Sequence, residues 1–169
     1  ANGSAATSNY IHATNNTIAG INITGANANG FMGIGYSNAA TTLAASSNIT
    51  GNTIGSSSAP INNSTTGNCI GISNTNTIGA TISGNTITSI NATNAATSQI
   101  VGITNTDGSV TIGSAGSGNV ISNLNNAAAN TGTAASTDFI VSNDQGTAST
   151  YYGDLGMTSS VFNSPGTNI

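Results

Sequence analysis

The sequence predicts an all-β fold, a right-handed parallel β-helix (β-solenoid) of about five coils, with about 34 residues and three short strands in each coil. Two observations lead to this prediction. The chain holds 20 Ile and 27 Thr against 3 Leu, and β-branched residues favour pleated strands over helices. The chain also contains an internal repeat, in which the same short strings return at a nearly constant spacing.

The repeat is clearest in the string Gly-Asn-[Thr/Val]-Ile, which occurs at 51–54, 84–87 and 118–121, with a copy at 15–18 that lacks only the Gly. Its asparagines are separated by steps of 36, 33 and 34 residues. We therefore expect one domain over 1–169, with repeats at approximately 16–51, 52–84, 85–118 and 119–152 and with extensions at 1–15 and 153–169.

Two further strings recur inside each repeat. One stands at 31–34, 69–72 and 100–103, with a degenerate copy at 139–141, and the other at 47–50, 78–82 and 110–112. In the clearest copies apolar residues alternate along the string, as in strands with one buried face. Three strands in each repeat follow, and the variable stretches from Ala39 to Ser46 and from Asn125 to Thr137 are predicted to be loops.

Equivalent residues of successive coils lie about 4.8 Å apart in a stacked fold. We expect a ladder of hydrogen-bonded amides formed by Asn16, Asn52, Asn85 and Asn119. Three interior columns would form the walls of the core: Ile18, Ile54, Ile87 and Ile121; Met32, Ile70, Val101 and Val141; and Ile49, Ile82 and Ile112.

Two other folds fit parts of the pattern. A period of 34 residues also suits helical repeat pairs, but Gly, Asn and Thr interrupt every candidate helix and no apolar helical face extends over 12 residues. An antiparallel sandwich uses short strands as well. Its strands need not share residue identities, whereas here the same residue types return at the same place in each repeat.

Composition narrows the possible functions. The chain has no Lys and no Arg, the residues that neutralise phosphates and anionic membranes, so we expect no binding of nucleic acid. No apolar run approaches the roughly 20 residues of a membrane span, so membrane insertion is not expected either. Four scattered Asp and one His make no acid–base pair or metal site, so we expect no enzyme activity, no catalytic residues, no metal and no cofactor.

The remaining reactive side chains have structural interpretations. His12 lacks partners nearby in the sequence and is expected at the surface or in a cap, while Cys69 aligns with Phe31 and Ile100 and is expected to pack as a small hydrophobe. The pattern for N-glycosylation, in which a glycan is attached to asparagine, is met at Asn2, Asn15, Asn22, Asn48, Asn62, Asn63 and Asn91. A glycoprotein is therefore one hypothesis.

The segments Gly84–Ile90 and Gly118–Leu124, in which Gly-Asn-[Thr/Val]-Ile leads to a second aliphatic residue, resemble the β-strand-repeat surface proteins secreted by gliding-type Gram-negative bacteria. The resemblance covers roughly residues 9 to 143. It implies a cell-surface or extracellular adhesin or fibre protein. The family's C-terminal sorting domain is not recognisable here, so we expect that it was removed or that the chain is part of a longer protein.

The sequence thus favours an extracellular structural or adhesive solenoid that associates with itself head to tail into a filament. Glycans or other surfaces are possible partners. Two alternatives stay open. Thr17, Thr53 and Thr86 form a file that suggests ice binding, although Val120 breaks it, and the shared fold of pectin-degrading enzymes suggests a carbohydrate-binding or carbohydrate-degrading β-helix.

Overall fold

The structure is a computed structural model, which describes residues 12–26, 28–37, 47–75, 80–94, 99–106, 110–127, 137–142 and 150–151. Within these ranges every regular element is a β-strand and there is no helix, so none that could span a membrane. All strand pairs among the described residues are parallel. The prediction of an all-β chain with parallel strands is confirmed for this part of the molecule.

The strands form three sheets. Sheet A contains β1 (His12–Thr14), β5 (Ser47–Thr50), β9 (Ala80–Ser83), β12 (Val110–Ile112) and β15 (Thr150–Tyr151). Sheet B contains β2 (Thr17–Ile18), β3 (Asn22–Ile23), β6 (Thr53–Ile54), β7 (Ile61–Asn63), β10 (Thr86–Ala92) and β13 (Val120–Asn126). Sheet C contains β4 (Phe31–Tyr36), β8 (Cys69–Asn74), β11 (Ile100–Asn105) and β14 (Thr137–Ser142).

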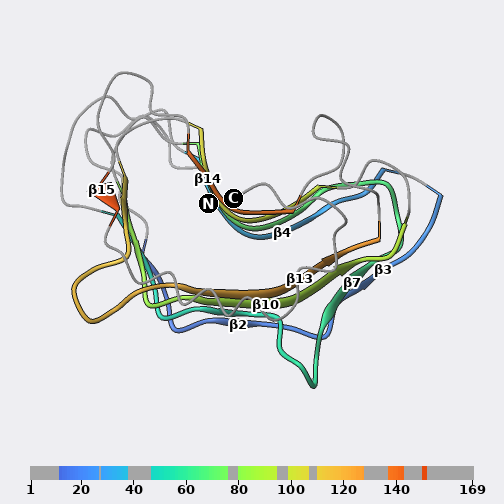
Figure 1. Ribbon diagram of the computed structural model, residues 1–169, viewed down its shortest axis with the longest axis horizontal. Helices are drawn as coiled ribbons and strands as arrows, with labels where there is room; N and C mark the ends of the chain where they lie inside the picture. Colours follow the sequence, from blue (N-terminus) through green and yellow to red (C-terminus); the bar gives the residue numbers. More distant parts are fainter. Residues whose placement is uncertain are drawn as a thin grey trace.

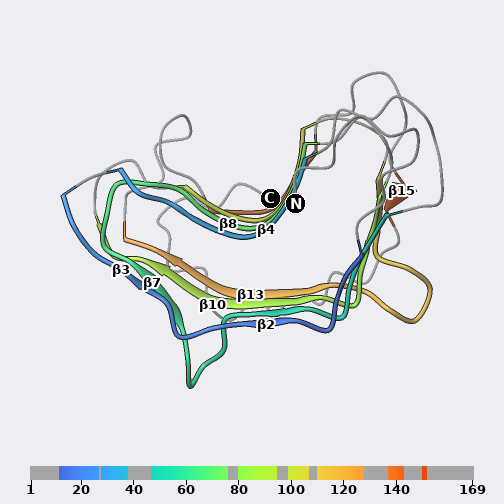
Figure 2. The same cartoon turned by 180° about the vertical axis from the view of Figure 1, so that it is seen from behind.

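The chain visits sheets A, B and C in this order and returns to sheet A at β5, β9, β12 and β15. Each strand therefore pairs with the strand one repeat away in the sequence. The Cα partners are the residues that the repeat aligns, as in the pairing of Ile54 with Ile18 on one side and with Ile87 on the other. Sheets B and C face each other as two curved walls, with β15 of sheet A at one side (Figures 1 and 2).

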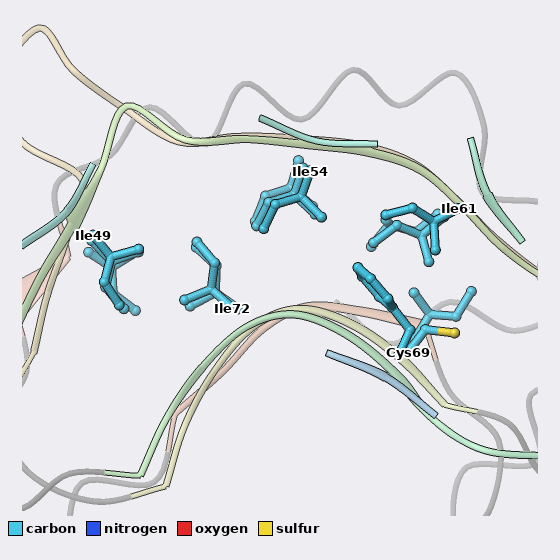
Figure 3. Close-up of a cluster of buried hydrophobic side chains, with 14 of the residues drawn as sticks. Ile49, Ile54, Ile61, Cys69 and Ile72 are labelled. Atoms are coloured by element: carbon cyan, nitrogen blue, oxygen red, sulfur yellow. The ribbon is translucent and has the colours of Figure 1, made fainter. Parts of the chain in front are cut away.

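The core lies between these walls and consists mainly of isoleucine. Ile49, Ile54, Ile61, Ile72 and Cys69 are completely buried, and their side chains point toward the space between the walls (Figure 3). Burying one such side chain contributes about 1.5–3 kcal/mol. Two of the predicted columns are in the core, since Ile54, Ile87 and Ile121 and also Ile49, Ile82 and Ile112 are at most 2% exposed, while Ile18 in the first turn is half-buried.

The prediction that Met32, Ile70 and Val101 form a column inside the core is wrong. The three residues are Cα partners, but Met32 is 53% exposed, Ile70 is half-buried and only Val101 is buried. Their neighbours form the wall of the core instead: Phe31, Cys69 and Ile100 on one side, and Ile72 and Ile103 on the other. Val141 also does not belong to this column, because it pairs with Thr104, and Val101 pairs with Asp138.

A column of glycines explains this arrangement. A Cβ at Gly71 would lie 2.5 Å from the carbonyl oxygen of Gly102 and 2.8 Å from Cγ2 of Ile87, and one at Gly33 would lie 2.9 Å from Cδ1 of Ile54. Gly71 thus faces the opposite wall, as Ile72 beside it does. Two consecutive inward residues change the phase of the strand, and the alternation assumed from the sequence fails there.

The Gly of the repeated string has a separate role. Gly51 and Gly84 have φ angles of 67° and 64°, in the left-handed region that costs a glycine little. Asn15 stands in their place in the first copy and has a φ of 56°, which asparagine tolerates better than most residues do. In these three copies the residue before the ladder asparagine therefore forms a left-handed corner between sheets A and B, whereas Gly118 of the last copy has no positive φ.

The predicted loop boundaries need two corrections. Asn125 and Asn126 belong to β13 and Thr137 begins β14, so the predicted loop is too long at both ends, whereas 38–46 and 128–136 lie outside the described residues. The connection between β6 and β7 is a protrusion that the sequence prediction missed (Figure 1). Six residues separate Ile54 from Ile61 there, but only two separate their partners Ile87 and Ile90.

Candidate functional site

Two columns of asparagine are the most highly organised polar features of the described residues. The inner ladder consists of Asn16, Asn52, Asn85 and Asn119, the four residues predicted to stack. The outer ladder consists of Asn22, Asn62, Asn91 and Asn125. Both ladders lie in sheet B or just before its strands. Successive members of each ladder are one repeat apart in the sequence.

The inner ladder follows one hydrogen-bond pattern. Oδ1 of Asn85 accepts from the backbone N–H of Asn52 at 3.0 Å and from its Nδ2 at 2.9 Å. Oδ1 of Asn119 accepts from the same two groups of Asn85, at 3.1 and 2.9 Å. Oδ1 of Asn52 accepts likewise from Asn16, at 3.0 and 2.9 Å.

Three of the four inner amides donate their second proton to a backbone carbonyl of the preceding turn. Asn52, Asn85 and Asn119 donate from Nδ2 to the carbonyl oxygens of Ala13, Ile49 and Ile82, each at 2.8 Å. These three asparagines are at most 1% exposed, whereas Asn16 is exposed. Because a buried amide without partners is costly, this complete set of bonds fixes the register between turns.

The outer ladder is simpler and runs in the opposite direction. Nδ2 of Asn62 donates to Oδ1 of Asn22 at 2.8 Å, Nδ2 of Asn91 donates to Oδ1 of Asn62 at 2.8 Å, and Nδ2 of Asn125 donates to Oδ1 of Asn91 at 2.7 Å. Asn62, Asn91 and Asn125 alternate with buried residues along their strands, and all four members of the ladder are exposed or half-buried. A groove of about 330 Å³ lies beside it, lined by Asn62, Asn91, Ala92, Thr93, Asn125, Asn126 and Ala127.

A third, shorter amide contact lies in sheet C. Asn74 donates from Nδ2 to Oδ1 of Asn105 at 2.6 Å, and both residues are fully buried. Tyr36 aligns with Asn74, and the Ser47 hydroxyl donates to its phenol oxygen at 2.7 Å. This contact ties sheet C to sheet A.

The described residues offer little acid–base or redox chemistry. No group of three or more His, Cys, Asp or Glu is close enough among them to hold a metal ion. Burial raises the pKa of the Cys69 thiol, and the hydrogen bond from Asn63 and a backbone hydrogen bond to Phe31 act against this rise. His12 is exposed on β1 and lies 3.5 Å from Nδ2 of Asn48.

The predicted glycosylation residues have different environments. Asn15 and Asn22 are exposed, and Asn48, Asn62 and Asn91 are half-buried. The suggestion for Asn63 is wrong for the folded chain, because Asn63 is completely buried and donates from Nδ2 to the carbonyl oxygen of Gly67 at 2.9 Å. Asn2 lies outside the described residues.

Sequence reasoning placed the inner ladder together but missed the outer one. The outer asparagines are separated by 40, 29 and 34 residues, because the protrusion between β6 and β7 lengthens one step and shortens the next. The Asn or Ala next to them at 63, 92 and 126 gave no constant motif either. No protein-family model, no curated protein and no solved structure matches the chain.

Proposed function

We propose that this chain is a non-enzymatic structural or adhesive element outside the cell, a right-handed parallel β-helix of about five coils that forms a subunit or a segment of a surface filament. The observation that carries the proposal is the in-register pairing of strands one repeat apart in all three sheets. A fold that repeats along one axis can be lengthened by further turns, because each turn contacts only its neighbours.

The composition supports the same function. The chain has no Lys, Arg or Glu, so it carries few charged groups, and many exposed residues of the described part are Asn, Ser or Thr. Such groups suit uncharged partners such as glycans or other surfaces. The resemblance to secreted β-strand-repeat proteins supports an extracellular location, and the glycoprotein hypothesis rests on the exposed Asn15 and Asn22.

The filament part of the proposal is tested by sedimentation velocity and negative-stain electron microscopy of the purified full chain at micromolar concentration. Fibres that grow with concentration are expected. A monomer at every concentration would leave only an adhesive role, which binding to a glycan array and to surfaces tests separately.

The two alternatives predict other results. The file of Thr17, Thr53 and Thr86 continues in register to Val120, which is 42% exposed, so ice binding would have to tolerate an apolar member. Thermal hysteresis of the purified chain tests ice binding, and release of reducing sugar from acidic polysaccharides tests degradation.

A further inference from the structure

We propose that both asparagine ladders continue from one copy of the chain into the next, with β13 of one copy paired to β2 and β3 of a following copy that stacks head to tail. This inference rests on the proposed filament function. It names the partner strands, their register and their polarity.

The outer ladder ends in an acceptor that lacks a donor. Asn62, Asn91 and Asn125 each donate from Nδ2 toward the preceding turn. In the register of the ladder, a donor to the last oxygen, Oδ1 of Asn125, would therefore come from a turn that follows. This oxygen has no hydrogen-bond partner, which is unfavourable for an amide. It is already buried in the single chain, so a following copy has to displace what covers it.

The first member of the outer ladder offers the missing donor. Asn22 is exposed and uses Oδ1 to accept from Asn62, and its Nδ2 donates to none of the described residues. In a head-to-tail stack Asn22 of the following copy takes the place above Asn125 that Asn125 takes above Asn91. Its Nδ2 then donates to Oδ1 of Asn125.

The inner ladder leads to the same head-to-tail arrangement of copies, although its hydrogen bonds run in the opposite direction to those of the outer ladder. Its amides donate from the backbone N–H and from Nδ2 toward the following turn. The last member, Asn119, would therefore donate to Oδ1 of Asn16 in the next copy, and Asn16 is exposed. A tail-to-tail contact would instead set the acceptor of Asn125 against its own equivalent.

The apolar side chains of the first turn would also gain cover. Ile18, Ile21 and Ile23 are half-buried, whereas Ile54 and Ile61 one repeat later are completely buried. Stacking β13 of a preceding copy on β2 and β3 would place aliphatic residues over Ile18 and Ile21, because Ile121 and Leu124 are their equivalents in the register.

Among the described strands, one has to move. If β2 of the following copy pairs with β13, its β1 lies against β12, where β15 now pairs through Thr111–Thr150 and Ile112–Tyr151. The three residues of β1 therefore displace the two residues of β15. β15 thus limits assembly, and weakening it should promote stacking.

The test compares Asn22→Asp with the matched control Asn68→Asp in the full chain. The first substitution keeps the oxygen that accepts from Asn62 but removes the donor for Asn125, while the second adds the same charge at an exposed residue whose Oδ1 accepts from the backbone N–H of Gln99 at 3.1 Å. Circular dichroism and thermal melts of dilute samples check that both variants fold alike.

Sedimentation at pH 7 should give a critical concentration for assembly at least about tenfold higher for Asn22→Asp than for Asn68→Asp. The reason is that assembly of Asn22→Asp no longer supplies the hydrogen bond that the buried Oδ1 of Asn125 lacks in the single chain. The gap should narrow at pH 3, below the ordinary carboxyl pKa of about 3.9, where the new side chain regains a proton to donate. Thr150→Pro, which weakens β15, should lower the critical concentration.

The outcomes separate this inference from the proposed function. Filaments with equal critical concentrations for the two Asp variants would overturn the ladder register and leave the filament function standing. A rise in critical concentration for Thr150→Pro would overturn the displacement of β15. A wild-type chain that stays monomeric would overturn the ladder junction together with the filament function.

Discussion

Asn52 and Asn85 are 33 residues apart, yet Oδ1 of Asn85 accepts hydrogen bonds from both the backbone N–H and Nδ2 of Asn52, at 3.0 and 2.9 Å. The same pair of hydrogen bonds joins Asn16 to Asn52 and Asn85 to Asn119. A buried amide that is bonded to the turns on both sides defines how the turns are aligned, because a slip of one residue would leave its groups unpaired.

Replacing Asn85 by Ala should therefore cost more stability than replacing Asn91 by Ala. Asn85→Ala removes four hydrogen bonds and leaves buried partners on Asn52 and Ile49 unsatisfied, at a cost of about 3 kcal/mol or more. Asn91→Ala removes two bonds between half-buried groups and should cost about 1 kcal/mol. Urea unfolding of dilute samples measures both. Equal losses would mean that the inner ladder does not fix the register.

The glycine column between the walls gives a second matched pair. Gly71→Ala would place a methyl group 2.5 Å from the carbonyl oxygen of Gly102 and 2.8 Å from Cγ2 of Ile87, and the strain should cost about 1–3 kcal/mol. At Gly35 the added methyl group would meet only the side chain of Met32, with Sδ at 2.8 Å and Cγ at 3.9 Å. Since Met32 is exposed and flexible, Gly35→Ala should change the free energy of unfolding by less than about 0.5 kcal/mol. A Gly71→Ala variant as stable as Gly35→Ala would contradict the close approach of the walls.

The buried thiol should make stability depend on pH in the alkaline range. Burial raises the pKa of Cys69 in the folded chain, so the unfolded thiol, with a pKa of about 8.5, ionises first. The neutral thiol makes its full contribution to stability below that pH. The free energy of unfolding then falls as pH rises toward the folded pKa, by at most about 1.4 kcal/mol per pH unit. The free energy of unfolding should fall relative to Cys69→Ala between pH 7 and 9.5. A constant difference between the two proteins would contradict the burial of the thiol.

The proposed absence of metal and of catalysis has a direct check. The described residues contain no cluster of His, Cys, Asp or Glu with the geometry of a metal site, so EDTA should leave the melting temperature unchanged. Incubation with acidic polysaccharides should release no reducing sugar. A drop in melting temperature that calcium reverses would require a site elsewhere in the chain.

Much of the fold could be predicted because the same residue types recur at equivalent positions of each repeat. The spacing of Asn16, Asn52, Asn85 and Asn119 identified both the turns and the ladder, since a buried amide that bonds to its own equivalents allows no other residue type. The neighbouring Ile54, Ile87 and Ile121 followed from strand alternation.

The rest depended on backbone geometry that one sequence does not reveal. Met32 was expected in the core because alternation was assumed to continue through Gly33, where the strand instead changes phase. The outer ladder was hidden because the residues between Gly55 and Pro60 disturb its spacing. In both cases a local insertion or bend changed the direction of side chains without changing which strands pair.

The central claim, that strands one repeat apart pair in register, is tested most directly by disulfide trapping in a Cys69→Ala background. Thr53 and Thr86 are Cα partners and half-buried, whereas Thr88 lies two residues further along the same strand. Parallel partners about 4.8 Å apart fall within the Cα range of about 4.4–6.8 Å for a disulfide. Under mild oxidation the double variant Thr53→Cys/Thr86→Cys should cross-link rapidly, and Thr53→Cys/Thr88→Cys should stay largely reduced. Cross-linking that is equal in both variants, or faster in the second, would contradict the register.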